Sequence, residues 1–134
     1  MNAGLDTSVV MRLLTGMPEA LAQGALREVQ RRIDAGGTVF VSDLVVAEVY
    51  FGLQHHYGMP KTEALELLSE FLRERGIEAM GAAVAVLATP NLATANPGLV
   101  DRLIHAEYRR HAGEMLTFKK AAGRLPGTRV LAGR

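Results

Sequence analysis

The sequence alternates short apolar runs, which are typical of β-strands, with longer segments that have helical periodicity. The strand-like runs cover residues 3–5, 38–41, 77–80, 114–118 and 127–131. In the segments between them, such as 19–35, 42–57 and 61–75, apolar residues recur at spacings of three and four. This alternation indicates an α/β fold. We therefore predict a central, mostly parallel sheet of four to five short strands, flanked by helices on both faces.

The length and composition fit one globular domain. The chain has 134 residues, of which 49% are hydrophobic and 22% are charged, so we treat residues 1–134 as a single domain. The absence of cysteine excludes disulfides, thiolate metal ligands and thiol nucleophiles. The first residues do not resemble a secretory signal, and Pro90 and Pro97 interrupt the longest uncharged stretch, residues 79–100. We therefore expect a cytoplasmic protein without a membrane partner.

Charge is distributed unevenly along the chain. The formal net charge is +1, but residues 1–101 hold 7 Lys/Arg against 12 Asp/Glu, whereas residues 102–134 hold 8 against 2. A basic final segment is a weak indication of a polyanionic partner near the C-terminus. An ordinary solvated basic helix face explains the same pattern equally well.

Two carboxylates occur where a functional site or a helix cap would place them. Asp6 directly follows the first predicted strand, and ligands of parallel sheets bind beyond the carboxyl ends of their strands. Asp6 is also a natural N-cap for the segment that follows. Asp101 lies in the first turns of a helix that we expect to begin at Asn96-Pro97. Taken alone, Asp101 is best explained as a surface carboxylate that interacts with the helix dipole.

Glu48 is the most informative of the acidic residues. On a helix it lies between Leu44 and Val45 one turn before and Phe51 and Gly52 one turn after, which predicts an apolar, buried environment. A lone buried charge costs several kcal/mol unless it is paired or bound to a metal, and the glycine leaves open space beside it. A buried salt bridge to Arg12 is the alternative, and we favour a functional site.

Three carboxylates without sulfur ligands point to a hard metal ion. Oxygen ligands suit Mg²⁺ or Mn²⁺, and such a site activates water and stabilises charge on a phosphodiester. His55 follows Glu48 by seven residues and His105 follows Asp101 by one turn, so either could be a ligand or an acid–base group. We rank this alternative lower because two helical turns span about 11 Å.

Four segments resemble, in order and at suitable spacing, the motifs of PIN-domain ribonucleases. They are LDTSVV at 5–10, SDLVVAEVYFGL at 42–53, LVDRLI at 99–104 and LTFKKAAGRLPG at 116–127. The length and the first two motifs are most similar to VapC-type toxins of bacterial toxin–antitoxin pairs.

The resemblance implies a single PIN-like domain and a specific activity. It implies that Asp6, Glu48 and Asp101 are catalytic and surround Mg²⁺ or Mn²⁺, and that metal-activated water hydrolyses RNA. Hydroxyls of Thr7 or Ser8 and of Thr117 would support this site, as the family's pattern implies. A homodimer, and inhibition by a small cognate antitoxin protein, are implied as well.

Lys119 departs from the family's pattern, which usually has an aspartate directly after Thr-Phe. An ammonium group there would repel a second cation and could pair with Asp6 or Asp101, so we expect reduced or absent activity. The basic final segment gains a role in this context, because it could line a track for RNA phosphates. Its candidate contacts are Arg102, Arg109, Lys120 and Arg124.

Two other functions remain open. The chain could be a catalytically inactive PIN-fold module that binds RNA or a protein, and Lys119 is the best support for that alternative. A phosphatase-like or nucleotide-binding α/β domain is disfavoured, because no glycine-rich phosphate loop follows the first strand.

Overall fold

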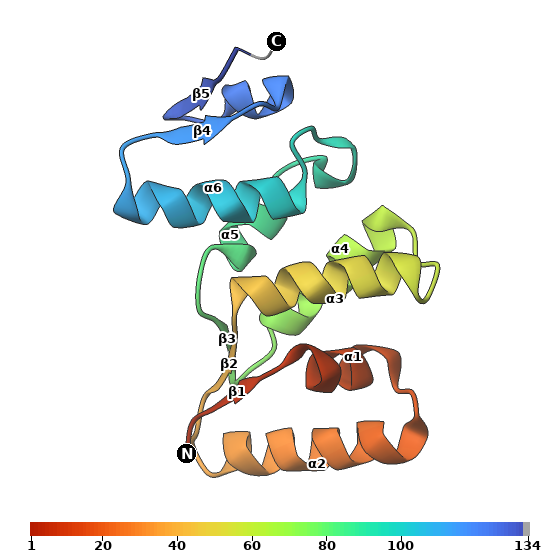
Figure 1. The fold of residues 1–134 in the computed structure, drawn as a ribbon. Coiled ribbons are helices and arrows are strands. Elements are labelled where there is room, and N and C mark those ends of the chain that lie inside the picture. The colour runs from red at the N-terminus through yellow and green to blue at the C-terminus, as the bar shows by residue number, and fades with distance from the viewer. Residues whose placement is uncertain (133–134) are drawn as a thin grey trace.

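A computed structural model describes residues 1–132, in which short strands alternate with helices (Figure 1). The elements in chain order are β1 (Ala3–Leu5), α1 (Thr7–Thr15), α2 (Glu19–Asp34), β2 (Val39–Val41), α3 (Asp43–His55), α4 (Lys61–Leu72), β3 (Ile77–Ala79), α5 (Ala83–Leu87), the 3₁₀ helix η1 (Leu92–Thr94), α6 (Leu99–His111), β4 (Met115–Thr117), the 3₁₀ helix η2 (Lys120–Arg124) and β5 (Thr128–Val130). The α/β fold class predicted from the sequence is confirmed.

The strands are parallel, as predicted, but they form two sheets instead of one. β1, β2 and β3 pair in that order, with Leu5 opposite Val41 and Val41 opposite Ala79. β4 pairs with β5 in a separate two-stranded sheet, with Met115 opposite Thr128. Figure 1 shows the two sheets well apart, with the β4–β5 pair at one end of the molecule and α6 next to it.

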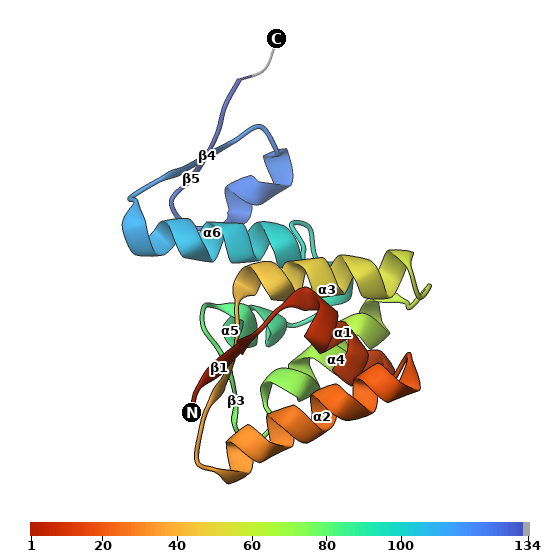
Figure 2. The same ribbon diagram turned by 60° about the horizontal axis from the view of Figure 1, so that its bottom comes forward.

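Helices cover the three-stranded sheet on one face, so the expectation of coverage on both faces is not met in residues 1–132. The covered face carries Leu5, Val39, Val41 and Ile77, which pack against helices. The opposite face carries Gly4, Phe40 and Glu78 in register, of which Gly4 and Glu78 are exposed and Phe40 is half-buried. The helices α1 to α4 lie to one side of these strands in both ribbon views (Figures 1 and 2).

The main core is built where α3 and α4 meet α1 and α6. Val49 and Leu53 of α3 are fully buried, and Ala64 and Leu68 of α4 expose no more than 1% of their surface. Leu103 of α6 joins the same cluster. Burial of apolar surface stabilises a fold by about 25 cal/mol per Å². This cluster is therefore the main stabilising contact between the helices. α3 therefore occupies a central position and has one outward-facing side.

Most helix boundaries lie close to those predicted, but α6 begins later than expected. Asn96-Pro97 was predicted to start it, whereas Gly98 is the N-cap and Leu99 the first helical residue. Pro97 is fully buried and packs in the loop before the helix. The consequence is that Asp101 lies in the first turn of α6. Within residues 1–132, no helix has the length and apolarity needed to cross a bilayer.

Candidate functional site

Asp6 caps α1 at the carboxyl end of β1. Its Oδ1 accepts hydrogen bonds from the Ser8 hydroxyl at 2.7 Å and from the Val9 backbone N–H at 3.1 Å. The helix-cap alternative that the sequence offered for Asp6 is therefore what the structure contains. The Ser8 hydroxyl, followed by the Val9 N–H, lowers the pKa of this exposed carboxyl below its usual value. Asp6 is consequently ionised at neutral pH.

Glu48 lies on the exposed side of α3, and the prediction that it is buried is wrong. Its apolar helical neighbours do not cover it, because Leu44 is 72% exposed and Phe51 is 47% exposed. The expected alternative, a salt bridge to Arg12, is also absent from residues 1–132. The Thr7 hydroxyl instead donates to Glu48 Oε1 at 2.5 Å. This bond joins the residue after Asp6 to Glu48.

Gly52 lines the same depression as Glu48, so open space lies beside the carboxylate as expected, but the glycine also serves helix packing. A Cβ atom at this position would lie 3.0 Å from the Met11 Cε, so the glycine makes room for Met11 of α1. The close approach of α1 and α3 at this point is what brings Thr7 within reach of Glu48. Gly52 therefore positions Glu48 indirectly, through the packing of two helices.

Asp101 is paired with Lys119. The Lys119 ammonium donates to Asp101 Oδ1 at 2.8 Å, and the two side chains keep 65% and 29% of their surface exposed. Of the two partners that the sequence left open for Lys119, Asp6 and Asp101, the structure contains the second. Asp101 belongs to the first turn of α6, and Lys119 follows β4, so the ion pair links these two elements.

Two neighbouring depressions divide these groups. The first, of about 410 Å³, is lined by Thr7, Met11, Glu48, Phe51, Gly52, His55 and His56. The second, of about 440 Å³, is lined by Tyr50, Phe51, Gln54, His55, Lys61, Lys119 and the first residues of α6 from Gly98 to Asp101. Phe51 and His55 line both, and their rings stack with centroids 6.0 Å apart and planes inclined by 21°. The stacked pair is thus a ridge between Glu48 and Asp101.

The residues do not fit a metal ion in this arrangement. Within residues 1–132, no three Asp, Glu or His side chains lie close enough to hold one. Glu48 and Asp101 line different depressions, and Asp6 lines neither. In addition, Asp101 is already paired with the Lys119 ammonium group. That the three acids share one metal stays a prediction of the sequence.

The other residues predicted to support the site have local partners. Thr117 Oγ1 accepts a hydrogen bond from the Lys119 backbone N–H at 3.0 Å and contacts no carboxylate in the hydrogen-bond pattern of residues 1–132. Three of the predicted phosphate contacts hold backbone carbonyls instead: Arg102 that of Pro97 at 2.7 Å, Arg109 that of Gly113 at 3.4 Å and Arg124 that of Asn96 at 3.3 Å.

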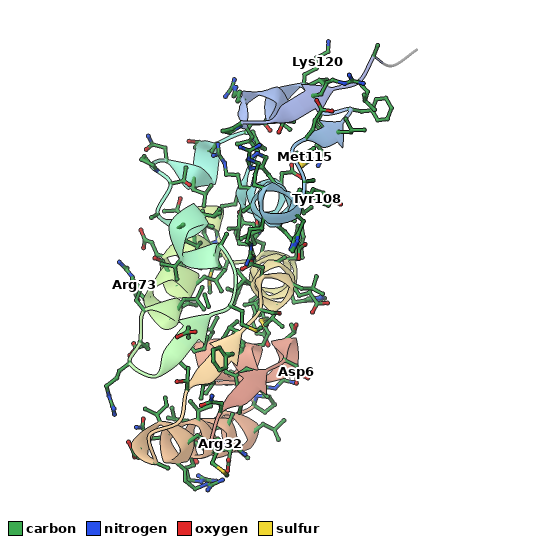
Figure 3. All side chains as sticks on the ribbon, turned by 90° about the vertical axis from the view of Figure 1, so that its left-hand side faces the viewer. Asp6, Arg32, Arg73, Tyr108, Met115 and Lys120 are labelled. Carbon is green, nitrogen blue, oxygen red and sulfur yellow. The ribbon has the colours of Figure 1, made fainter. Side chains whose placement is uncertain are left out.

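Lys120 is exposed, but it lies far from the first catalytic candidate. Figure 3 shows it at the end of the molecule opposite α2, well separated from Asp6. Lys120 and Asp6 therefore do not belong to one compact site. Contact of these side chains with RNA stays a prediction.

His55 and His105, the two histidines considered as ligands or acid–base groups, have different roles in the fold. His105 is buried, and its Nε2 donates to the Pro126 carbonyl at 2.7 Å, which attaches α6 to the segment before β5. That makes His105 a structural residue. His55 is exposed and lines both depressions, although its ring stacks on Phe51 instead of approaching Glu48.

Sequence reasoning missed Lys61 as a residue of the candidate site. It is the first residue of α4 and lies outside all four motif segments, yet it lines the same depression as Asp101 and Lys119. No local pattern could have indicated this, because the position depends on how α3, α4 and α6 pack together. The break at Gly58-Met59-Pro60 that starts α4 was the only related signal.

Comparison with known proteins identifies one family. The model of the PIN domain matches residues 4–126, which is most of the chain and includes the first three motif segments and all but the last residue of the fourth. Searches of curated proteins and of solved structures gave no match.

Proposed function

Because this chain belongs to the PIN domain family, we propose that it is an endoribonuclease with Asp6, Glu48 and Asp101 as its catalytic carboxylates. The family has a nuclease-type fold and is commonly metal-dependent, so Mg²⁺ or Mn²⁺ is the expected cofactor. The observation that best supports the proposal is the hydrogen bond from Thr7 to Glu48. It brings Glu48, the acid of the second motif, next to Thr7, which directly follows Asp6, the acid of the first motif.

The chain's own residues prepare two of these acids for chemistry. Ser8 and the Val9 N–H stabilise the ionised form of Asp6, and Thr7 fixes the orientation of Glu48. The ionised carboxylate of Asp6 and the oriented carboxylate of Glu48 can each accept a proton from an attacking water. Asp101 can join them only if its ion pair with Lys119 opens, because one oxygen of Asp101 holds the ammonium group.

Cleavage of RNA under controlled metal conditions tests this proposal. Total RNA is incubated at neutral pH with Mn²⁺, Mg²⁺ or EDTA and with the wild-type protein, Asp6→Ala, Asp6→Asn or Lys119→Asp. We expect metal-dependent cleavage by the wild type that both Asp6 variants lose. Asp6→Asn is the informative control, because asparagine caps helices about as well as aspartate. Its inactivity would reflect the lost charge and not a weakened α1.

Lys119→Asp shows whether the lysine limits the activity. Cleavage by this variant alone would mean that the ammonium group disables an otherwise complete site. Cleavage by the wild type and by this variant would mean that the ion pair opens in use. Absence of cleavage by all folded variants would contradict the nuclease proposal.

A second candidate function is supported by the ion pair itself. Lys119 neutralises Asp101, and the remaining acids are dispersed, as expected of a PIN-fold module that binds RNA or a protein without cleaving it. This candidate predicts RNA binding that survives Asp6→Ala and does not require a metal. The cleavage experiment, followed by binding measurements on the same variants, separates the two candidates.

We propose further that the chain acts as the toxin of a toxin–antitoxin pair and forms a homodimer. The support is the similarity of its first two motifs to VapC-type toxins. Induced expression in a bacterial host should arrest growth with the wild type and not with Asp6→Asn. Light scattering on the purified protein tests the dimer. Normal growth at equal amounts of soluble wild-type protein would contradict the toxin role.

A further inference from the structure

We propose that the depression between α3, α4 and α6 binds one nucleotide of single-stranded RNA. The phosphate lies beside Lys61 and Lys119, and the base stacks against Phe51 at the ridge. The choice of RNA rests on the proposed function, whereas the binding chemistry rests on the residues of the depression itself. We call this depression the nucleotide pocket.

The size and construction of the nucleotide pocket suit such a ligand. Its volume of about 440 Å³ lies within the range of about 300–1,000 Å³ that is usual for small-ligand sites. Its walls come from three helices and from the residues after β4, which are far apart in sequence. A pocket assembled from packed helices holds its side chains more firmly than a loop on the surface would.

The charged groups of the pocket favour an anion. Lys61 and Lys119 approach it from different elements, and Asp101 is the one carboxylate among its lining residues. Lys61 has no ion pair in the part of the chain that the structure describes. Its ammonium group is therefore available to a phosphate, to which lysine binds as a point charge.

The aromatic side of the pocket favours a base over a simple phosphate. Phe51 keeps 47% of its surface exposed, whereas Tyr50 and Leu53 of the same helix are buried. Its ring stacks on His55, which fixes the orientation of the pair. Pre-oriented aromatic faces next to a positive charge bind successive bases of single strands without reading their sequence. The pocket combines an exposed aromatic ring with two lysine ammonium groups.

Asp101 competes with the ligand for Lys119. Its carboxylate holds the ammonium group at 2.8 Å, and an incoming phosphate must share or displace that contact. The proposal therefore makes an unusual prediction for an acidic residue in a nuclease fold. Replacing Asp101 by asparagine should strengthen RNA binding when no metal is present.

Fluorescence anisotropy with a labelled ten-nucleotide RNA, measured in EDTA over a range of salt concentrations, tests the pocket. The variants are Lys61→Gln, Phe51→Ala and Asp101→Asn. Arg75→Gln is the control for loss of one positive charge, since Arg75 is exposed and lies beyond the other end of α4. Phe118→Ala is the control for loss of an exposed aromatic ring, since Phe118 is 70% exposed and does not line the pocket.

We expect Phe51→Ala to weaken binding by about tenfold, in line with the loss of one stacked base. Lys61→Gln should weaken it by a few fold and reduce the slope of log affinity against log salt by about 0.7. Asp101→Asn should tighten it, and the two controls should leave it within about twofold. Duplex RNA of the same sequence should bind more weakly, because its bases are stacked internally.

Equal effects of Lys61→Gln and Arg75→Gln, or of Phe51→Ala and Phe118→Ala, would overturn the pocket in favour of diffuse binding. Absence of binding by the wild type, or equal affinity for duplex RNA, would overturn it as well. Because binding is measured without metal, failure here leaves cleavage to be judged separately. A wild type that cleaves RNA while the pocket variants bind normally refutes the pocket alone. Weakened binding by the pocket variants, together with no cleavage by the wild type, refutes the nuclease proposal alone.

Discussion

At Asp6 a single carboxylate caps a helix and is also the first catalytic candidate. Its hydrogen bonds to Ser8 and Val9 exist whether or not the protein has an activity. The cap alone therefore explains why an acidic residue follows β1. This is why the Asp6→Asn variant, which retains the cap, is a sharper test of function than Asp6→Ala.

The pH dependence of stability should report the hydrogen bonds at Asp6. Its pKa is lower in the folded protein than in the unfolded chain, so ionisation favours the folded state above the unfolded value of about 4. This contribution is lost as the pH falls through the folded value. Urea unfolding of the wild type and of Asp6→Asn between pH 6 and pH 2 should show a difference that shrinks on acidification. A difference that is constant over the range would contradict it.

The ion pair between Lys119 and Asp101 should contribute little to stability. Both side chains are partly exposed, and solvent screens such pairs. We expect Lys119→Ala to change the free energy of unfolding by less than about 1 kcal/mol. A double-mutant cycle with Asp101→Asn measures the coupling between the two side chains. A loss of several kcal/mol would mean that the pair organises the fold, not the site.

Glu48 illustrates what the sequence could not predict at this scale. Leu44 and Phe51 form an apolar stripe around it, and periodicity identifies such a stripe without identifying what covers it. Here nothing in residues 1–132 does. The Thr7 hydroxyl contacts Glu48, and its support of a functional site, which the family's pattern implies, stays a prediction.

Among the elements, α3 is the one on which the fold and the candidate site both depend. Its inner residues belong to the core, and its outer residues line both depressions. We expect Leu53→Ala to lower the free energy of unfolding by about 2–5 kcal/mol, because the side chain is fully buried. Leu44→Ala, on the exposed side, should change it by no more than about 0.5 kcal/mol. Urea titrations of both variants test this, and equal losses would contradict the assignment of the two faces.

The elements themselves were well predicted because their signals are local. Ser42 caps α3 through the Val45 N–H, and Gly16 ends α1 in a left-handed conformation, as such residues do at helix ends. The start of α6 was missed because Pro97 is held by burial in the preceding loop, which depends on distant parts of the chain. Strand pairing has the same dependence, so the division into two sheets could not be foreseen.

For the whole molecule, the separation of the two sheets predicts unequal local stability. β4 packs against α6 and η2, and His105 anchors the segment before β5 through the Pro126 carbonyl. β1 and β2 lie against the main core. We expect the amides of 115–117 and 128–130 to exchange with solvent faster than those of β1 and β2. Hydrogen exchange followed by mass spectrometry measures this difference.

His105→Gln is the matched variant for that experiment. It should speed exchange in β4 and β5 while leaving β1 and β2 unchanged, because the ring bonds only the segment before β5 in the described residues. Acceleration throughout the chain would mean instead that the C-terminal sheet and the main core unfold together. Uniform protection in the wild type would contradict the prediction of unequal stability.

The open edges of the two sheets also bear on how the protein behaves in concentrated solution. β1 pairs on one side only, and β4–β5 is a two-stranded ribbon, so both sheets present unpaired backbone groups to other chains. Each strand has only three residues, so a docking chain would gain few hydrogen bonds. The short length of the edge strands thus protects the protein against fibre growth. A substitution that lengthened either edge strand would remove that protection, and aggregation, not loss of activity, would be its first symptom.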